Sequence, residues 1–245
     1  ATHNHHGPAF GLNPYITYGL SPNQVDLIRD YELWFRGQII EIVRKAIYDL
    51  TPVEVYCGQA SLNYSYQRIQ GFNRWNFMDM SVLAFKHAGT QNNKAIVVSY
   101  PAHPIIMGPS NMQWHPDHLG VHLRNLEQRT GSIVLPMQGA GGDLNPRSGF
   151  GVMNCERYGI AEADATLGII NNSLTPLTGR INSEYAEVLL PLNLPDSDTL
   201  RKNFKRIIQY SNPNTPEWRY ATVMQEKMKS GTLPSSVPFP MIVWQ

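Results

Sequence analysis

The sequence lacks several features that would place it in a familiar class of protein. Its 245 residues contain two cysteines, Cys57 and Cys155, too few for a disulfide framework and without the spacing of metal ligands. No apolar run reaches the roughly 20 residues that a membrane-spanning helix needs. Acidic and basic side chains nearly balance, with a net charge of +1, whereas nucleic-acid binding needs clustered positive charge. We therefore expect two buried thiols, no transmembrane segment and no nucleic-acid partner.

Common catalytic and nucleotide-binding motifs are also missing. The glycine-rich segment 138–146 has neither the Gly-Lys-Ser/Thr of a phosphate loop nor the spacing of a dinucleotide-binding turn. No Gly-x-Ser-x-Gly elbow is present, which argues against a serine hydrolase of the common kind. The densest basic cluster, 201–206, repeats at helical spacing and favours a solvated helix face. Nucleotide binding and serine-elbow chemistry are therefore not predicted.

The sequence does contain interleaved helical and strand patterns. Apolar residues three to four apart predict helices near 22–50, 116–130, 156–171, 198–209 and 216–229. Alternating or continuous apolar runs predict strands at 53–57, 81–86, 94–100, 132–136, 181–192 and 241–245. Polar stretches rich in turn-forming residues predict loops at 7–20 and 58–76. The fold class is α/β or mixed α+β, with layered sheets flanked by helices, in a single catalytic-type domain over 1–245.

Histidines are the most informative residues. In an extended segment His3 and His5 point to one side and His6 to the other, and two imidazoles on one face are a typical beginning of a zinc site. An exposed histidine-rich terminus is the alternative. His103, directly after the buried strand 94–100, is the strongest partner for this pair, with a purely structural histidine as its alternative. Together, the two motifs favour metal binding.

A second histidine pair has the spacing of helical zinc ligands. His118 and His122 are four residues apart, but Leu119 stands where the H-E-x-x-H motif has its glutamate. A helical zinc site is therefore the less favoured interpretation. Asp117, near the start of this helix, is expected to bind backbone N–H groups.

Three segments together resemble the neutral/alkaline, non-lysosomal ceramidases. The opening Ala-Thr-His-Asn-His-His-Gly-Pro (1–8) resembles the Thr-His-Thr-His-Ser-Gly-Pro motif of that family. Ser-Tyr-Pro-Ala-His-Pro-Ile-Ile-Met (99–107) is similar to its strand ending in Ala/Val-His-Pro. Gln-Gly-Ala-Gly-Gly-Asp-Leu-Asn-Pro (138–146) resembles its active-site loop, Gly-Asp-x-Ser-Pro-Asn. The resemblance covers residues 1 to about 150 and is weaker beyond.

The resemblance implies a zinc-dependent amidase that acts on N-acylsphingosine or a related lipid amide or small molecule. It implies the catalytic-domain fold of that family and a secreted or membrane-surface protein. His3 and His103 would bind Zn²⁺, and His5 would assist proton transfer or oxyanion stabilisation. Asp143 would belong to the catalytic loop. The two remaining family ligands, a Glu and a Tyr, are expected outside this chain.

Departures from the family leave a second interpretation open. Asn145 stands in place of the loop serine, Arg147 in place of the final asparagine, and Tyr64 in place of an arginine in the polar loop after the first strand. The alternative is a catalytically silent relative that serves as a binding or structural component.

The chain is also expected to be truncated at both ends. It opens within the histidine motif and closes on the apolar strand 241–245. Missing N- and C-terminal segments of the same protein, or another chain, would complete the metal site. Both termini are expected to lie in or beside the core, near other strands.

Overall fold

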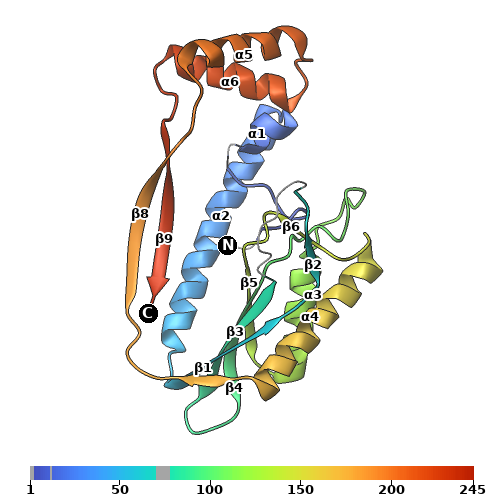
Figure 1. Ribbon diagram of the computed structural model, residues 1–245, viewed down its shortest axis with the longest axis vertical. Helices are drawn as coiled ribbons and strands as arrows, with labels where there is room; N and C mark the ends of the chain where they lie inside the picture. The colour runs from blue at the N-terminus through green and yellow to red at the C-terminus, as the bar shows by residue number, and fades with distance from the viewer. Residues whose placement is uncertain (1–2, 12, 70–77) are drawn as a thin grey trace. The chain divides into compact units, whose positions relative to one another are not determined.

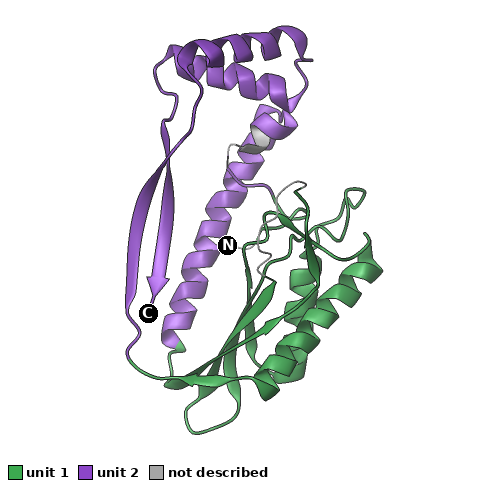
Figure 2. Ribbon diagram, in the orientation of Figure 1, with its two compact units in different colours: residues 1–8, 49–179 green, residues 9–48, 180–245 purple. Residues whose placement is uncertain are grey.

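A computed structural model describes residues 3–11, 13–69 and 78–245. These residues form two compact units (Figure 2). Unit 1 comprises residues 1–8 and 49–179, and unit 2 comprises 9–48 and 180–245. Helices and strands alternate along the chain, so the predicted α/β class is confirmed. The prediction of one catalytic-type domain over 1–245 stays a prediction.

Unit 1 is built on a five-stranded sheet with the order β5-β4-β3-β1-β7 (Figure 1). β4 and β5 are parallel, and the other neighbouring strands are antiparallel. A separate two-stranded sheet pairs β2 with β6. The strands of unit 1 are β1 (Val53–Ser61), β2 (Ser65–Gln67), β3 (Asp79–His87), β4 (Asn93–Tyr100), β5 (Ile133–Gln138), β6 (Leu144–Pro146) and β7 (Thr175–Leu177).

Two helices cover one face of the larger sheet, α3 (Asp117–Thr130) and α4 (Val152–Asn172). Strand alternation decides which side chains enter the core between them. In β3, Met80, Val82 and Ala84 are buried, while the residues between them are less so. Met80 and Val82 pack with Ile96 and Val98 of β4, Val121 and Leu126 of α3, and Cys155, Ala163 and Ile169 of α4.

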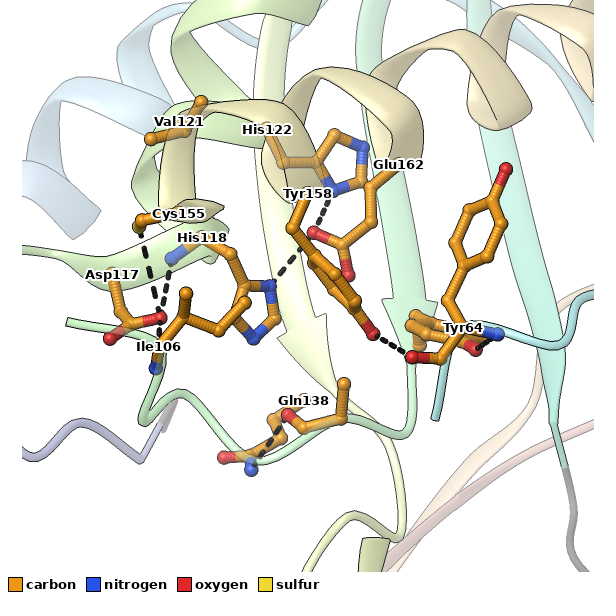
Figure 3. Close-up of polar contacts among 12 residues, drawn as sticks. Tyr64, Ile106, Asp117, His118, Val121, His122, Gln138, Cys155, Tyr158 and Glu162 are labelled. Carbon is orange, nitrogen blue, oxygen red and sulfur yellow. Dashed lines mark hydrogen bonds and ion pairs between the residues drawn. The ribbon is translucent and has the colours of Figure 1, made fainter. Parts of the chain in front are cut away.

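A buried polar link joins the two helices (Figure 3). His118 Nδ1 lies 2.8 Å from Glu162 Oε2, and His122 Nε2 lies 2.9 Å from Thr166 Oγ1. Burial alone would lower the pKa of His118, but the Glu162 carboxylate outweighs it and raises that pKa. Because unpaired polar groups are costly in a core, these contacts fix how α3 and α4 face each other.

Unit 2 contains four helices and a two-stranded ribbon among its described residues. The helices are α1 (Asn13–Tyr18), α2 (Pro22–Tyr48), α5 (Ser197–Tyr210) and α6 (Pro216–Lys229). β8 (Ser183–Pro191) and β9 (Ser236–Trp244) pair along their whole length. From α6, the Arg219 guanidinium donates to the Ile16 and Thr17 carbonyls at the end of α1. It thereby satisfies carbonyls that have no partner within the helix.

Most predicted elements are confirmed, with shifted ends. Ser21 and Gln24 form a capping box at the start of α2. Gly131, with a φ of 66°, ends α3, and the Thr215 hydroxyl caps α6. The loop prediction was wrong for α1, β2 and the second half of β1. β9 pairs with β8, but both strands are exposed instead of lying in the core, because a two-stranded ribbon buries few side chains.

The structure describes both cysteines and the length and apolarity of the helices. Both thiols are free; Cys155 is buried and Cys57 partly buried. Burial raises the pKa of Cys155 to about 12, so its thiol stays protonated. No helix among the described residues combines the length and apolarity needed to cross a membrane.

The crossing of α3 and α4 depends on Gly159. A Cβ at this position would lie 2.6 Å from Val121 Cβ and 2.8 Å from the His118 carbonyl oxygen. We expect Gly159→Ala to lower the free energy of unfolding by about 1–3 kcal/mol through overpacking. Gly168→Ala, in the same helix but with nothing within 4 Å, should raise it by up to about 1 kcal/mol. Urea unfolding measures both, and equal effects would contradict close packing at Gly159.

Candidate metal centre

The centre begins where two parallel strands end. β4 pairs in register with β5, from Ala95 opposite Ile133 to Tyr100 opposite Gln138. Parallel strands finish at the same edge of a sheet, so the segments 101–104 and 139–143 emerge side by side. The Gly139 N–H donates to the Tyr100 carbonyl, at 3.1 Å. The glycine-rich loop 138–146, which resembles the family's active-site loop, therefore lies against the His-Pro segment 103–104.

Glycine is required for this close approach. A Cβ on Gly139 would lie 3.0 Å from the Pro101 nitrogen, and one on Gly141 would lie 3.0 Å from the Ala102 nitrogen. Both neighbours are backbone atoms, which cannot rotate away as a flexible side chain could. The glycines thus serve backbone packing beside a candidate site.

His103 is held on both its backbone and its ring. Its N–H donates to the Leu144 carbonyl at 2.9 Å, and its Nδ1 lies 3.1 Å from the Gly141 carbonyl. A carbonyl oxygen only accepts, so Nδ1 carries the hydrogen and Nε2 keeps its lone pair. This arrangement is typical of a metal-binding histidine, whose second ring nitrogen bonds a backbone carbonyl.

The N-terminal segment docks through its even-numbered residues. The Asn4 side chain donates to the His115 carbonyl at 3.1 Å and accepts from the His6 N–H at 2.5 Å. The His6 ring is buried and donates to the Gly108 carbonyl at 3.0 Å, while the His115 N–H donates to the His6 carbonyl. Asn4 and His6 thus face the 108–115 loop, whereas His3 and His5 lie with His103.

His3, His5 and His103 come together. Their candidate ligand nitrogens all lie within 4.8 Å of one another. The ring centroids are 4.7–5.0 Å apart, so the three imidazoles are almost equally spaced. The shortest polar contact joins His5 Nε2 to His103 Nε2, at 2.9 Å. The structure therefore brings together all three histidines that the sequence singled out around one point.

Partial burial lowers the pKa of two of these rings, His5 and His103. Partial burial is the main cause that lowers the pKa of His5, followed by the charges of His3 and His103. Burial also dominates the lowered pKa of His103, partly offset by the hydrogen bond to Gly141. A neutral imidazole has the lone pair that a metal ligand or a general base needs. At pH 7 both histidines are therefore in the state suited to either role.

Arg68 is the residue that sequence reasoning missed. Burial is the main cause that lowers the pKa of both His5 and His103, and the positive charge of Arg68 contributes to each, as the smallest cause for His5. Arg68 follows β2, and its N–H donates to the Asp143 carbonyl at 2.9 Å. The Asp143 carboxylate accepts from Gln67 Nε2 at 2.7 Å. Asp143 therefore holds the end of β2 that carries Arg68, and no local sequence signal marks that long-range pairing.

Asn145 and Tyr64 lie in different surroundings. Asn145 is the central residue of β6, opposite Tyr66, and its side-chain oxygen is buried without a hydrogen-bond partner among the described residues. Tyr64 packs its ring 6.0 Å from Tyr158 and lines a cavity of about 360 Å³ with Arg147. None of the three histidines lines that cavity.

The His118–His122 pair does not form a second cluster. His118 Nδ1 bonds Glu162 of α4 (Figure 3), and His122 Nε2 bonds Thr166 of the same helix. Asp117 accepts from the N–H groups of Ile106, Met107 and His118, which confirms its expected backbone role. Among the residues that the structure describes, His3, His5 and His103 are the one group of three potential metal ligands.

The cluster fits a zinc ion. Tetrahedral zinc with bonds of about 2.0–2.1 Å places its ligand atoms about 3.3 Å apart. In this structure His5 Nε2 and His103 Nε2 are 2.9 Å apart, and all candidate ligand nitrogens lie within 4.8 Å of one another. The separation that zinc needs falls within this range. Imidazole nitrogen is a preferred zinc ligand, and the carbonyl bond that orients His103 is of the kind found around such ligands.

Comparison with known proteins supports the fold. No family model and no curated protein sequence matches the chain. A solved structure described as a ceramidase complexed with C2 is 20% identical, with a TM-score of 0.52, over 59% of this chain and 26% of that one. The neutral ceramidase from Pseudomonas aeruginosa is 17% identical, with a TM-score of 0.60, over 84% and 40%.

These likenesses define a ceramidase-like fold. Both structures are neutral ceramidase or ceramidase by description, so the resemblance noted in the sequence is confirmed at the level of the fold. The chain spans less than half the length of either structure. Identity this low shows the fold alone, and the chemistry rests on the residues themselves.

The docking of the N-terminal segment through Asn4 is testable. We expect Asn4→Ala to free the His6 N–H and to weaken zinc affinity about tenfold, because groups that orient ligands act on affinity at this scale. Hydrogen exchange at His6 and a competition titration with a zinc chelator measure the two effects. Asn172→Ala, at an exposed helix end, is the control. Unchanged exchange at His6 would contradict the docking.

Proposed function

We propose that this chain carries the metal-binding part of a zinc-dependent hydrolase that cleaves an amide bond. The observation that carries the proposal is the convergence of His3, His5 and His103 beside a glycine loop on a ceramidase-like fold. The substrate class we propose is N-acylsphingosine or a related lipid amide, because both similar structures are of ceramidases.

His3 and His103 are the proposed zinc ligands. His103 presents a lone pair at Nε2, since its other nitrogen is committed to Gly141. Among the described residues, no Asp, Glu or Cys belongs to the histidine group, so we place the remaining ligands outside this chain. When bound, zinc would supply Lewis-acid polarisation of the amide carbonyl and lower the pKa of a coordinated water.

His5 and Arg68 are the proposed groups for proton transfer and charge stabilisation. His5 is neutral at pH 7 because its pKa is lowered, so its ring can accept a proton from water and return it to the leaving amine. The Arg68 guanidinium, whose field reaches His5 and His103, suits an oxyanion that develops beside them. The sequence comparison placed Tyr64 where the family has an arginine. We instead assign the role of that arginine to Arg68.

Asp143 and Asn145 are the proposed supports on the loop side. Asp143 fixes β2 through Gln67 and through the Arg68 N–H, and thereby positions the Arg68 side chain. Asn145 replaces a serine of the resembling family, and its buried oxygen has no partner within the described chain. Such an atom is costly unless a ligand or water satisfies it. This observation also favours the second candidate, a silent relative that binds a lipid amide without cleaving it.

The role of His5 separates acid–base work from metal binding. We expect His5→Ala to keep zinc content but to lower the rate of amide hydrolysis by about 10²–10⁴-fold, the range for a lost general acid or base. Elemental analysis and release of fatty acid from an N-acylsphingosine measure the two quantities. His87→Ala, at an exposed strand end, is the matched control. Loss of zinc from the His5 variant would show that His5 is a ligand. The nearly equal spacing of the three rings is compatible with that role.

Asn145 tests whether the chain is active or silent. We expect Asn145→Ser to raise the hydrolytic rate at least about tenfold, because a hydroxyl both donates and accepts where the amide oxygen has no partner. Asn154→Ser, in the first turn of α4, serves as the control. The proposed hydrolase would be excluded if wild type and Asn145→Ser both bound zinc and a ceramide analogue without any turnover.

A further inference from the structure

Helix α5 has two contrasting sides. Its apolar side packs on α6: Phe204 is buried with its ring 6.3 Å from that of Tyr220, and Trp218 Nε1 donates to the Ile208 carbonyl at 3.2 Å. Figure 1 shows the two helices side by side within unit 2. Because this side is occupied, α5 cannot insert apolar side chains into a partner without leaving α6.

The other side of α5 is basic. Arg201, Lys202, Lys205 and Arg206 are all exposed, and their spacing places them on one helix face. Arg201 pairs with Asp198 at 2.7 Å. Lys202, Lys205 and Arg206 have no ion pair among the described residues.

Positive charge is concentrated in this part of the chain. The helical hairpin 197–229 contains seven basic and three acidic residues, a net charge of +4, whereas the whole chain carries +1. The sequence alone suggested a solvated helix face. The structure adds that the paired apolar side leaves the basic side facing outward, and that one of its four cations is neutralised by a neighbour.

We propose that the basic face of α5 docks on an anionic membrane surface. A cluster of four or more basic residues on an amphipathic helix is attracted to acidic lipid head groups, each cation adding about fivefold to the partition. Tyr210, exposed at the end of α5, is a residue type that favours the membrane interface. The partner rests on the proposed function, since a lipid-amide substrate resides in a bilayer.

The docking is electrostatic and peripheral. With Phe204 held against α6, the helix lies on the head groups and does not enter the acyl region. Binding should therefore weaken as the screening length falls from about 10 Å at 0.1 M salt to about 3 Å at 1 M. A nucleic acid is the less favoured partner, because four cations on one short helix provide fewer than the roughly 6–10 phosphate contacts of strong binders.

Vesicle binding tests the proposal. Intact protein is sedimented with phosphatidylcholine vesicles that contain or lack phosphatidylserine. We expect binding only to the phosphatidylserine vesicles, with release at high salt. The triple variant Lys202→Glu, Lys205→Glu, Arg206→Glu should bind about 100-fold more weakly. Arg29→Glu, Arg36→Glu, Lys45→Glu on α2 changes the net charge equally and should lose much less. In case the glutamates unfold the helix, a second variant replaces the same three residues with glutamine. Its helix content is checked by circular dichroism.

Several outcomes would overturn the docking surface. Equal losses in the two triple variants would mean that net charge acts instead of the α5 face. Equal binding to vesicles without phosphatidylserine would mean apolar contact. If the protein bound duplex DNA but not vesicles, and the α5 variant lost the DNA binding, the face would be assigned to nucleic acid. Hydrolysis of a water-soluble short-chain amide should be unchanged in the α5 variant, so failure of the docking and failure of the proposed hydrolase can be told apart.

Discussion

The parallel pairing of β4 with β5 places two loops at one edge of the sheet, and the candidate metal centre depends on that pairing. The segment after β4 carries His103, and the segment after β5 carries the glycines on which it rests. The Gly141 carbonyl then orients the His103 ring through Nδ1. A shift of either strand by one residue would reverse the faces of its side chains and separate the ring from the carbonyl that orients it.

The N-terminal segment reaches this edge by a different physical route. It forms no strand pairing among its described residues, and its position comes from side chains that satisfy backbone groups of the 108–115 loop. Asn4 and His6 contribute no candidate ligand, yet they determine which way His3 and His5 point. The buried contact of His118 with Glu162 fixes α3, the helix that follows this loop, against α4. Polar contacts thus position the N-terminal histidines, while the apolar core of unit 1 supports the sheet that carries His103.

The two units contribute different properties. Unit 1 contains the sheet, the apolar core and the histidine group. Unit 2 contains long elements with few buried side chains, and its charge is unevenly distributed. The histidine group therefore belongs to unit 1, and the basic face of α5 belongs to unit 2.

The sequence by itself determined the long helices, the β3–β4 hairpin and the candidate histidines, because local periodicity and turn chemistry set those features. The position of His103 after a buried strand also follows from neighbouring residues. Tertiary structure alone decided that these histidines meet, that the Arg68 N–H pairs with the Asp143 carbonyl and that Tyr64 lines a separate cavity. It also decided β2 and β6, three-residue strands that exist only because they pair across more than 70 residues. Such contacts leave no local pattern, since their stabilisation comes from partners that only the folded chain brings near.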